Sequence, residues 1–433
     1  MKSLKKLLIL LVVIGLIGAV VFYFRDTTEP QLTLTPNSGP ISNKSKLLLS
    51  LTDAGSGLKD LQVTMVQKNN RMPLLEQSFP VSTETTDIEL DLGKVKLEEG
   101  DFQIEVRATD SAIYHFGKGN QASKTFSLTY DSRPPIISIL SKAHNFSRGG
   151  SGLVVFSVNE EVTQAGIQFG DLFFPAFRQP SGHYACLFAY PYFMAEKDFV
   201  PRVVAQDLAG NERQTGIYYR AKYKRFRDRD IKISKSFLDM KTPELEPLAP
   251  NAQTPIDIFL YVNREVRKAN RAKMAELSKD TSPTPLWKDS FLRQPKAATL
   301  AQFADHRTYY YEGKKVDEAY HLGYDLASVA QAEIEAANDG KVVWAEYLGI
   351  YGLCVVIDHG LGLQTLYAHM SQLDVHPGDL VSRGQIIGRS GATGMAGGDH
   401  LHFGVFVSGI PVQPVEWWDQ HWLTDNIDSK LQL

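Results

Sequence analysis

The sequence predicts a mainly β chain that contains an N-terminal membrane-spanning helix, two β-sandwich modules, a helical connector and an all-β C-terminal domain. Three observations support this prediction. One long uncharged apolar run opens the chain, alternating apolar and polar positions between turn residues recur over most of the remaining residues, and a helical pattern appears near residues 254–278. The predicted parts are a cytoplasmic tip with its anchor at 1–25, modules at 26–132 and 133–222, the connector at 223–295 and the C-terminal domain at 296–433.

The composition is that of a globular protein with several domains. With 433 residues, 43% of them apolar and 22% charged, the chain is too long for one compact core, and one domain per ~150 residues gives about three. Its net charge of -3 provides no basic surface for phosphate backbones, so we expect no nucleic-acid partner. Cys186 and Cys354 lie far apart among apolar residues and are predicted to be unpaired core thiols.

The apolar run at residues 7–24 predicts the membrane anchor. As a helix, its 18 uncharged residues would rise about 27 Å, close to the thickness of a hydrocarbon core. A cleaved secretory signal is the alternative, but its apolar region normally runs only ~7 to 15 residues and ends at a small-residue site. The run ends instead in an aromatic and basic collar, Phe22-Tyr23-Phe24-Arg25. Lysines 2, 5 and 6 precede it, so the N-terminus is predicted to be cytoplasmic and the rest of the chain to face outward.

The two predicted modules share a short repeat. Residues 106–112 match residues 203–209 at four of seven positions, and each segment is followed by a Gly-Asn pair, Gly119-Asn120 or Gly210-Asn211. This spacing fits one sandwich per copy, and both copies resemble the Ig-like modules of bacterial surface proteins. The repeated Asp110 and Asp207 are interpreted as hydrogen-bonded turn residues, with calcium ligation as the alternative.

The connector combines a charged segment with a helix. Residues 224–230 mix basic and acidic side chains and are interpreted as a solvated linker. Thr254 as N-cap and Pro255 at the first helical position predict a helix that ends near Ser278. Its polar face is basic, so it could lie on a membrane, but packing on the neighbouring domain is the favoured interpretation.

Three predicted strands of the C-terminal domain each carry imidazole or carboxylate opposite an apolar face. Alternation groups His321 with Asp325, His400 with His402, and Tyr367 with His369. Imidazole and carboxylate are zinc ligands, and three protein ligands with an open position define a catalytic site. Such a site generates hydroxide near pH 7, and the remaining histidines can move the proton and stabilise the oxyanion, which describes amide hydrolysis. The chemistry alone leaves open which of the four histidines bind metal.

The motifs H-x-G-x-D, Y-x-H and H-L-H-F-G, in this order and with the sequence GDLVSRGQIIG between the last two, resemble the lysostaphin/LytM-type zinc metallopeptidases. The resemblance covers roughly residues 303–418. It implies that Zn²⁺ is bound by His321, Asp325 and His402, with His369 and His400 as the catalytic pair. It also implies peptide stems of peptidoglycan as the substrate. Tyr324, where aliphatic residues are usual, is expected to alter packing only.

The leading hypothesis is a zinc endopeptidase, held in the bacterial inner membrane by one N-terminal helix, that cuts peptidoglycan cross-links in the periplasm or cell-wall space. The single inner anchor favours, as the bond that is cut, one from D-Ala to a diamino acid over a Gly-Gly bond. The rival hypothesis is a non-catalytic scaffold that activates other wall hydrolases, against which the complete set of site residues argues. In a third hypothesis, residues 223–295 or the two modules cover the site until a regulatory protein partner moves them.

The other histidines and the glycine-rich segment receive simpler interpretations. His359 and His376 sit at turn signals and are interpreted as surface turn residues. His306 and Arg307 are expected either to line the substrate cleft or to make an interdomain contact. Residues 390–398 lack the ending of a phosphate loop and are interpreted as a loop at the rim of the substrate groove.

Overall fold

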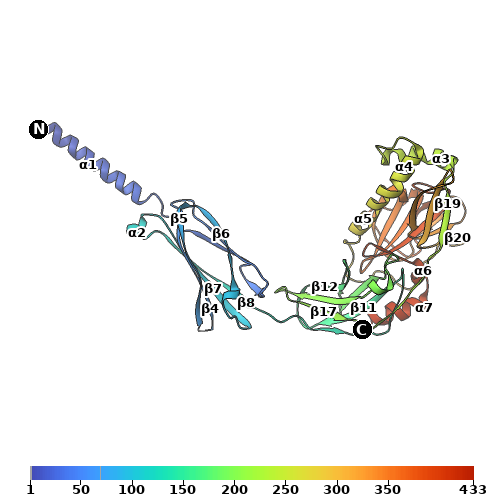
Figure 1. The fold of residues 1–433 in the computed structure, drawn as a ribbon, viewed down its shortest axis with the longest axis horizontal. Coiled ribbons are helices and arrows are strands. Elements are labelled where there is room, and N and C mark those ends of the chain that lie inside the picture. The colour runs from blue at the N-terminus through green and yellow to red at the C-terminus, as the bar shows by residue number, and fades with distance from the viewer. Residues whose placement is uncertain (1, 69) are drawn as a thin grey trace. The chain divides into compact units, whose positions relative to one another are not determined.

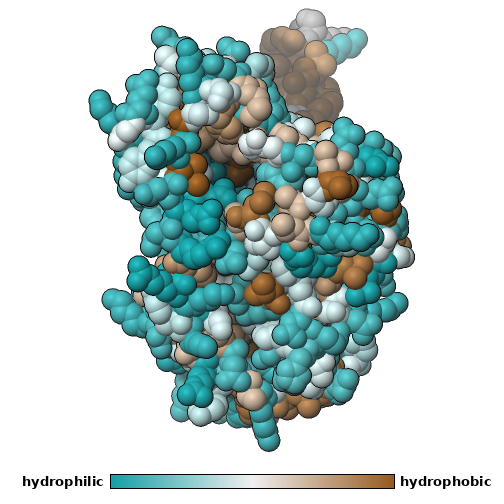
Figure 2. Space-filling view, turned by 90° about the vertical axis from the view of Figure 1, so that its right-hand side faces the viewer, coloured by the Kyte–Doolittle hydropathy of each residue, from teal (hydrophilic) through white to brown (hydrophobic). Residues whose placement is uncertain are grey.

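The computed structural model describes residues 2–68 and 70–433 (Figure 1). Contacts divide the chain into two compact units. Unit 1 holds residues 1–135 with two short segments, 160–163 and 206–212, and unit 2 holds the rest. The predicted fold class is confirmed, since the chain is mainly β with several sheets and an apolar N-terminal helix. The face shown in Figure 2 is mostly hydrophilic, with hydrophobic side chains in small separate groups.

The N-terminal helix α1 (Lys2–Tyr23) is apolar, and none of its residues from Leu4 to Tyr23 is buried. That part, Leu4–Tyr23, is long and apolar enough to cross a bilayer. A signal sequence has the same length and composition, so both explanations of this helix are compatible with the structure.

The first module of unit 1 is built from two sheets, ordered β1-β3-β6 and β2-β8-β7-β4-β5. Strand β7 shows the predicted alternation, because Phe102, Ile104, Val106 and Ala108 are all buried. A continuous apolar core from both sheets fills the module. The elements are β1 (Gln31–Thr35), β2 (Gly39–Ile41), β3 (Leu47–Thr52), β4 (Leu58–Gln67), β5 (Asn70–Thr83), β6 (Thr85–Leu90), β7 (Gly100–Asp110), α2 (Tyr114–Gly117) and β8 (Gln121–Tyr130).

The second module has two four-stranded sheets, ordered β14-β15-β11-β9 and β13-β12-β16-β17, and the parallel pair β10-β18. Its core is rich in phenylalanine, with Phe146, Phe188 and Phe199 packed ring against ring. The strands are β9 (Ile137–Ile139), β10 (His144–Ser147), β11 (Ser151–Val158), β12 (Val162–Phe169), β13 (Leu172–Pro175), β14 (Phe177–Arg178), β15 (Tyr184–Ala189), β16 (Arg202–Asp207), β17 (Glu212–Gly216) and β18 (Tyr219–Lys222).

The repeated aspartates make the same pair of hydrogen bonds in both modules, although Asp110 and Asn120 are separated by ten positions and Asp207 and Asn211 by four. Asp110 accepts hydrogen bonds from the backbone N–H of Asn120 at 2.7 Å and from its side-chain amide at 2.7 Å. Asp207 accepts the same two bonds from Asn211, at 2.8 Å and 3.0 Å. All four residues are buried. These hydrogen bonds agree with the turn interpretation. Each aspartate also lies in a group of three carboxylates that could hold a cation, Asp26, Asp53 and Asp110 or Asp131, Glu160 and Asp207, which agrees with the calcium alternative.

The connector is more ordered than the sequence suggested. Instead of a solvated linker, the charged segment contains strand β19 (Asp228–Lys232), which pairs in parallel with β21. Next come α3 (Lys235–Leu245), α4 (Pro255–Tyr261) and α5 (Arg267–Leu277), the last two joined by one π-helical turn. Thr254 caps α4 by accepting the N–H of Asp257, as predicted.

The helices of the connector pack on the C-terminal domain. Val262 and Met274 are buried in one apolar cluster with Cys354, Val356 and Leu366 of the large sheet. The packing interpretation of the amphipathic helix is therefore confirmed. Both cysteines are buried and unpaired, as predicted, and burial raises the pKa of each thiol.

The C-terminal domain is built on a ten-stranded sheet whose central order is β23-β30-β27-β26-β25. A second sheet, β19-β21-β22, adds the connector strand to this domain. The elements are β20 (Ala298–Ala301), β21 (Asp305–Tyr311), β22 (Lys314–His321), β23 (Tyr324–Ala327), β24 (Glu333–Glu335), β25 (Gly340–Tyr347), β26 (Leu353–Gly360), β27 (Leu363–Leu373), β28 (Leu380–Val381), β29 (Ile386–Ser390), β30 (Leu401–Val407), β31 (Ile410–Val412), α6 (Pro414–Trp417), α7 (Gln420–Leu423) and α8 (Ser429–Leu431).

Within unit 2, a buried carboxyl joins the second module to the C-terminal domain. Glu416 of α6 accepts the backbone N–H of Ser151 at 2.9 Å and the side-chain amide of Gln413 at 2.7 Å. A Cβ on Gly150 would lie only 2.2 Å from a Glu416 carboxylate oxygen, so the close approach requires glycine there. Burial raises the pKa of Glu416 to about 7. A second contact is aromatic, since Tyr192 packs edge-on against Phe303.

Candidate metal centre

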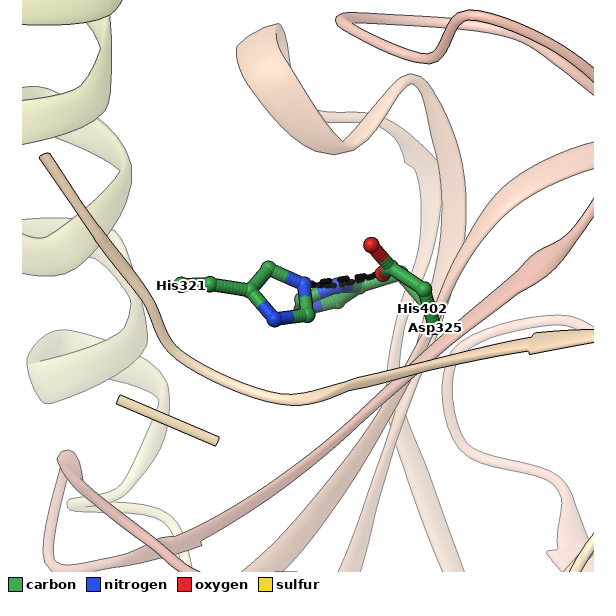
Figure 3. Close-up of side chains that lie close together, drawn as sticks. All are labelled: His321, Asp325 and His402. Atoms are coloured by element: carbon green, nitrogen blue, oxygen red, sulfur yellow. Dashed lines mark hydrogen bonds and ion pairs between the residues drawn. The ribbon is translucent and has the colours of Figure 1, made fainter. Parts of the chain in front are cut away.

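Two sheets bring His321, Asp325 and His402 together, the first residue from the three-stranded sheet and the other two from adjacent strands of the large sheet. His321 ends β22, Asp325 lies in β23, and the β23–β30 register sets Asp325 directly opposite His402. Figure 3 shows the three side chains pointing toward one another. They are buried, and each offers a ligand atom within 4.8 Å of the other two. Of the groups in the described residues that could hold a metal ion, this one alone contains histidine.

The distances within this cluster favour a bound cation. Nε2 of His321 lies 2.8 Å from Oδ1 of Asp325 and 3.0 Å from Nδ1 of His402, and that Nδ1 lies 2.9 Å from the same carboxylate oxygen. The other ring nitrogen of His321 lies 2.9 Å from the carbonyl oxygen of Gln302, to which it donates. Nε2 of His321 and Nδ1 of His402 thus both face the same carboxylate oxygen, and each contact needs a proton or a metal cation between its two atoms. A His, His, Asp set fits Zn²⁺ by its donor chemistry.

The electrostatics keep these groups in the protonation states that metal ligands need. Burial raises the pKa of Asp325, but the charge of His321 and hydrogen bonds from His321, His400 and His402 outweigh it and hold that pKa well below its ordinary value. Burial lowers the pKa of His402 to about 4. A carboxylate and a neutral imidazole therefore coexist at neutral pH.

A second pair of imidazoles lies beside the cluster. The rings of His369 and His400 are 4.9 Å apart, and each ring fixes its Nδ1 on a backbone carbonyl, of Thr393 and Gly398 respectively, at 2.8 Å. Burial lowers the pKa of His369, as do the charges of His400 and His402. Burial also opposes the charged form of His400, but Asp325, 3.5 Å from its Nε2, raises the pKa of His400 overall. The two pKa values are driven apart, as in an acid and base pair.

The prediction that Tyr367 accompanies His369 is wrong. The Tyr367 hydroxyl instead accepts the N–H of Ala337 at 2.7 Å, and its ring packs edge-on against Phe403 in the core. The reason is a break in the strand. His369 has a φ of 64°, and the pairing of β27 with β26 shifts register nearby, so simple alternation does not hold across these residues. The break turns His369 alone toward the site.

The predictions for the remaining histidines have different outcomes. His359 is not a surface turn residue, because it is fully buried between the carbonyl of Asp339 at 2.7 Å and the hydroxyl of Thr365 at 2.8 Å. His376 is exposed, as predicted. His306 contacts Asp228 of β19 at 3.1 Å, which is a contact to the connector. Tyr324 packs against Trp418, in keeping with a packing role.

A cleft of about 320 Å³ opens over the cluster. It contains all five predicted site residues and Arg307, which contacts Asp325 at 3.0 Å. The glycine-rich loop contributes Met395, Ala396 and Gly397 to its wall, as the rim interpretation predicts. The connector also supplies a wall of the cleft, in keeping with the hypothesis that residues 223–295 cover the site. The sequence predicts a basic helix face there but not which connector residues line the cleft, and these are Ile231, Lys232, Ile233, Phe237, Phe259, Arg267 and Arg271.

The C-terminal domain also matches a known protein family. Residues 319–414 match the family model "Peptidase family M23", so the C-terminal domain is an M23 domain of the LytM type, as the resemblance implied. A comparison with a solved structure adds only a partial superposition: the catalytic domain of lysostaphin from Staphylococcus simulans is 26% identical, with 28% of this chain and 92% of that one covered and a TM-score of 0.25.

Three curated relatives match the same region. The DD-carboxypeptidase/endopeptidase Mpg of Neisseria meningitidis is 39% identical over 95 residues, 22% of each chain. The peptidoglycan DD-endopeptidase ShyA of Vibrio cholerae is 41% identical over 98 residues, 23% of each chain. The murein hydrolase activator EnvC of Escherichia coli is 38% identical over 95 residues, 22% of this chain and 23% of the relative. The chain thus matches less than a quarter of these relatives' length.

Proposed function

We propose that this protein is a zinc endopeptidase that hydrolyses peptide cross-links of peptidoglycan. The observation that carries the proposal is the convergence of His321, Asp325 and His402 beside His369 and His400 in one cleft. The names of two relatives support it, since Mpg is called a DD-carboxypeptidase/endopeptidase and ShyA a peptidoglycan DD-endopeptidase. The proposal keeps the predicted division of the chain into β-sandwich modules at 26–132 and 133–222, a connector at 223–295 and the C-terminal domain at 296–433.

Each site residue has a role that its environment supports. His321, Asp325 and His402 would hold Zn²⁺, which when bound supplies a Lewis acid and an activated water. His369, kept neutral by burial, accepts the proton of the attacking water through Nε2, because its Nδ1 is held by Thr393. His400, whose pKa Asp325 raises, would in its protonated form donate from Nε2 to the oxyanion that forms at the scissile carbonyl.

The proposed location follows from α1. The lysines before the apolar span and the aromatic collar after it favour a single-pass anchor in the inner membrane, with the N-terminus in the cytoplasm. The M23 domain then faces the periplasm or cell-wall space, where a peptidoglycan substrate is found. A regulatory protein partner is part of this proposal because the connector contributes directly to the cleft.

The test is digestion of purified sacculi by the full chain loaded with zinc. Release of soluble muropeptides is expected from the wild type, and His369→Ala should reduce the rate by at least about 100-fold. His376→Ala, an exposed histidine outside the cleft, is the matched control and should keep full activity. Equal release by wild type and His369→Ala would contradict the mechanism. Mass spectrometry of the products identifies the cleaved bond.

The second candidate function is a scaffold that activates other wall hydrolases. It is favoured by the similarity to EnvC, whose name describes an activator, and by the connector's share of the cleft. Metal analysis separates the two candidates. Near-stoichiometric zinc in the wild type, lost in Asp325→Ala, favours the enzyme, whereas a wild-type protein that binds no zinc and releases nothing favours the scaffold.

A further inference from the structure

The cleft carries more positive charge than the metal site explains. Four cationic side chains, Lys232, Arg267, Arg271 and Arg307, line it together with a single carboxylate, that of Asp325. A metal cation in the His-Asp cluster would add to this excess. Side chains of like charge in one cleft repel each other, so the arrangement needs a reason beyond folding.

Two of these cations have partners within the protein. Arg307 contacts the Asp325 carboxylate at 3.0 Å. Arg267 is half-buried and donates to the side-chain oxygen of Asn263 at 2.7 Å, which orients its guanidinium without neutralising it. Burial lowers the pKa of Arg267, and the charges of Arg271 and Arg307 lower it further. Three guanidinium groups are thus close enough to repel one another.

Arg271 has no such partner. It is exposed, follows Arg267 by one helical turn on α5, and makes no hydrogen bond or ion pair with any residue in 2–68 or 70–433. Like charges four residues apart destabilise a helix slightly. Its charge also acts on Tyr351 of the cleft, whose pKa burial raises to about 12 against the opposing influence of Arg267 and Arg271. Arg271 therefore contributes a free fork of donors to the cleft and nothing evident to stability.

We propose that Arg267 and Arg271 form a carboxylate-binding wall that holds an anionic peptide beside the metal centre. This inference rests on the proposed function and specifies its substrate: a peptide cross-link with a free carboxylate near the scissile bond. Guanidinium groups bind carboxylates in a bidentate manner, which fixes orientation as well as charge. Bridges of glycine alone offer no such side-chain carboxylate and are poor substrates. The apolar part of the cleft, with Phe237 and Phe259, accepts the aliphatic stem.

The first test measures binding without turnover. The full chain is titrated calorimetrically with two synthetic stem peptides that contain no cleavable cross-link and differ only in one group, a free carboxylate or a carboxamide on the diamino acid. We expect the wild type to prefer the carboxylate by about 10-fold, as for one charged hydrogen bond. Arg271→Gln should remove this preference. Lys268→Gln, which removes the same charge from an exposed position of α5 outside the cleft, should retain it.

The second test uses the matching cross-linked substrates. Arg271→Gln should raise KM about 10-fold for the carboxylate substrate and leave kcat, zinc content and melting temperature close to wild type, because the residue is exposed. Arg271→Lys should recover part of the binding, since it keeps the charge but loses the fork. Equal affinity of the wild type for both peptides, an unchanged preference in Arg271→Gln, or a similar loss in Lys268→Gln would overturn the wall.

The two proposals fail in different ways. If the wild type releases nothing from any substrate but prefers the carboxylate peptide in the binding test, the proposed hydrolysis fails and the carboxylate-binding wall stands. If the wild type cleaves both substrates equally well, the enzyme stands and the wall fails. A variant Arg271→Gln that becomes faster on both substrates would show that the connector covers the cleft, and it too would overturn the wall.

Discussion

The two β-sandwich modules repeat one design but belong to different parts of the molecule. Both close a turn with a buried aspartate and asparagine, Asp110 with Asn120 and Asp207 with Asn211. The first module lies in unit 1, whereas most of the second lies in unit 2 with the connector and the M23 domain. A repeated fold therefore does not imply a repeated role, since most of one copy shares a compact unit with the M23 domain and contacts it.

The contacts of the second module explain this difference. Its β11 begins at Ser151, whose N–H binds the buried Glu416 of the M23 domain, and Gly150 leaves room for that carboxyl. Its Tyr192 shares an apolar cluster with Phe303 and Leu322, the residue directly after His321. The second module thus supports the strand that carries a predicted metal ligand.

The largest expected effect comes from truncation. Residues 133–433 should fold with a melting temperature of the M23 domain within about 2 °C of the full chain, because the supporting contacts remain. In the fragment 223–433, the free energy of unfolding of the M23 domain should fall by more than about 3 kcal/mol relative to the full chain. The reason is that the aromatic cluster and the carboxyl of Glu416 lose their partners. Calorimetry of both fragments measures this. A stable 223–433 fragment would contradict the supporting role of the second module, because both modules would then be dispensable spacers.

The fold was predictable where local pattern decides it. Alternating apolar and polar positions predicted strands with one buried face, of which β7 is an example, and Thr254 followed by Pro255 predicted a helix start. Both are present. The strand at 228–232 was not predictable, because its partner residues lie 78 positions further along the chain and its own composition is that of a solvated segment. Pairing between distant segments is decided by packing that local sequence does not contain.

The site was predictable to a similar extent. His321, Asp325 and His402 stand out through their alternation with apolar residues, and the structure brings them together. Tyr367 was misplaced because the backbone break at His369 cancels the period of two. His359 was misplaced because its burial depends on Thr365 and Asp339, two partners that a turn signal does not reveal. The arginines of α5 join the cleft only through the packing of their helix.

The joint between the second module and the M23 domain should depend on pH. The pKa of Glu416 is about 7 in the folded protein against an ordinary value of 4.5, so the folded state binds the proton more tightly. The stability that protonation provides is present at low pH and is lost as pH rises from about 4.5 through about 7, by about 3 kcal/mol in total. Unfolding in denaturant between pH 4.5 and 8 measures this.

Glu416→Gln isolates the source of that dependence. The amide cannot ionise, so the variant should lose this part of the pH dependence and be more stable than the wild type above pH 7. Glu346→Gln, at an exposed position of the same domain, is the control and should follow the wild type. If wild type and Glu416→Gln show the same pH dependence, the buried carboxyl does not couple the module to the domain, and the comparison rests on apolar contacts alone.

The smallest expected effect concerns what the two modules share. Asp110→Asn and Asp207→Asn keep the shape of the side chain but replace a carboxylate oxygen that accepts the asparagine amide by a donor. Each substitution should lower the free energy of unfolding of its module by about 1 to 3 kcal/mol, because the side-chain amide of the asparagine is left buried without an acceptor. Hydrogen exchange at the amides of Asn120 and Asn211 measures the loss at each turn separately. The loss should be similar in both modules and independent of calcium, as expected for turns that hydrogen bonds close. If millimolar calcium instead slows exchange at both turns in the wild type but not in the variants, the aspartates are metal ligands and the turn interpretation is wrong.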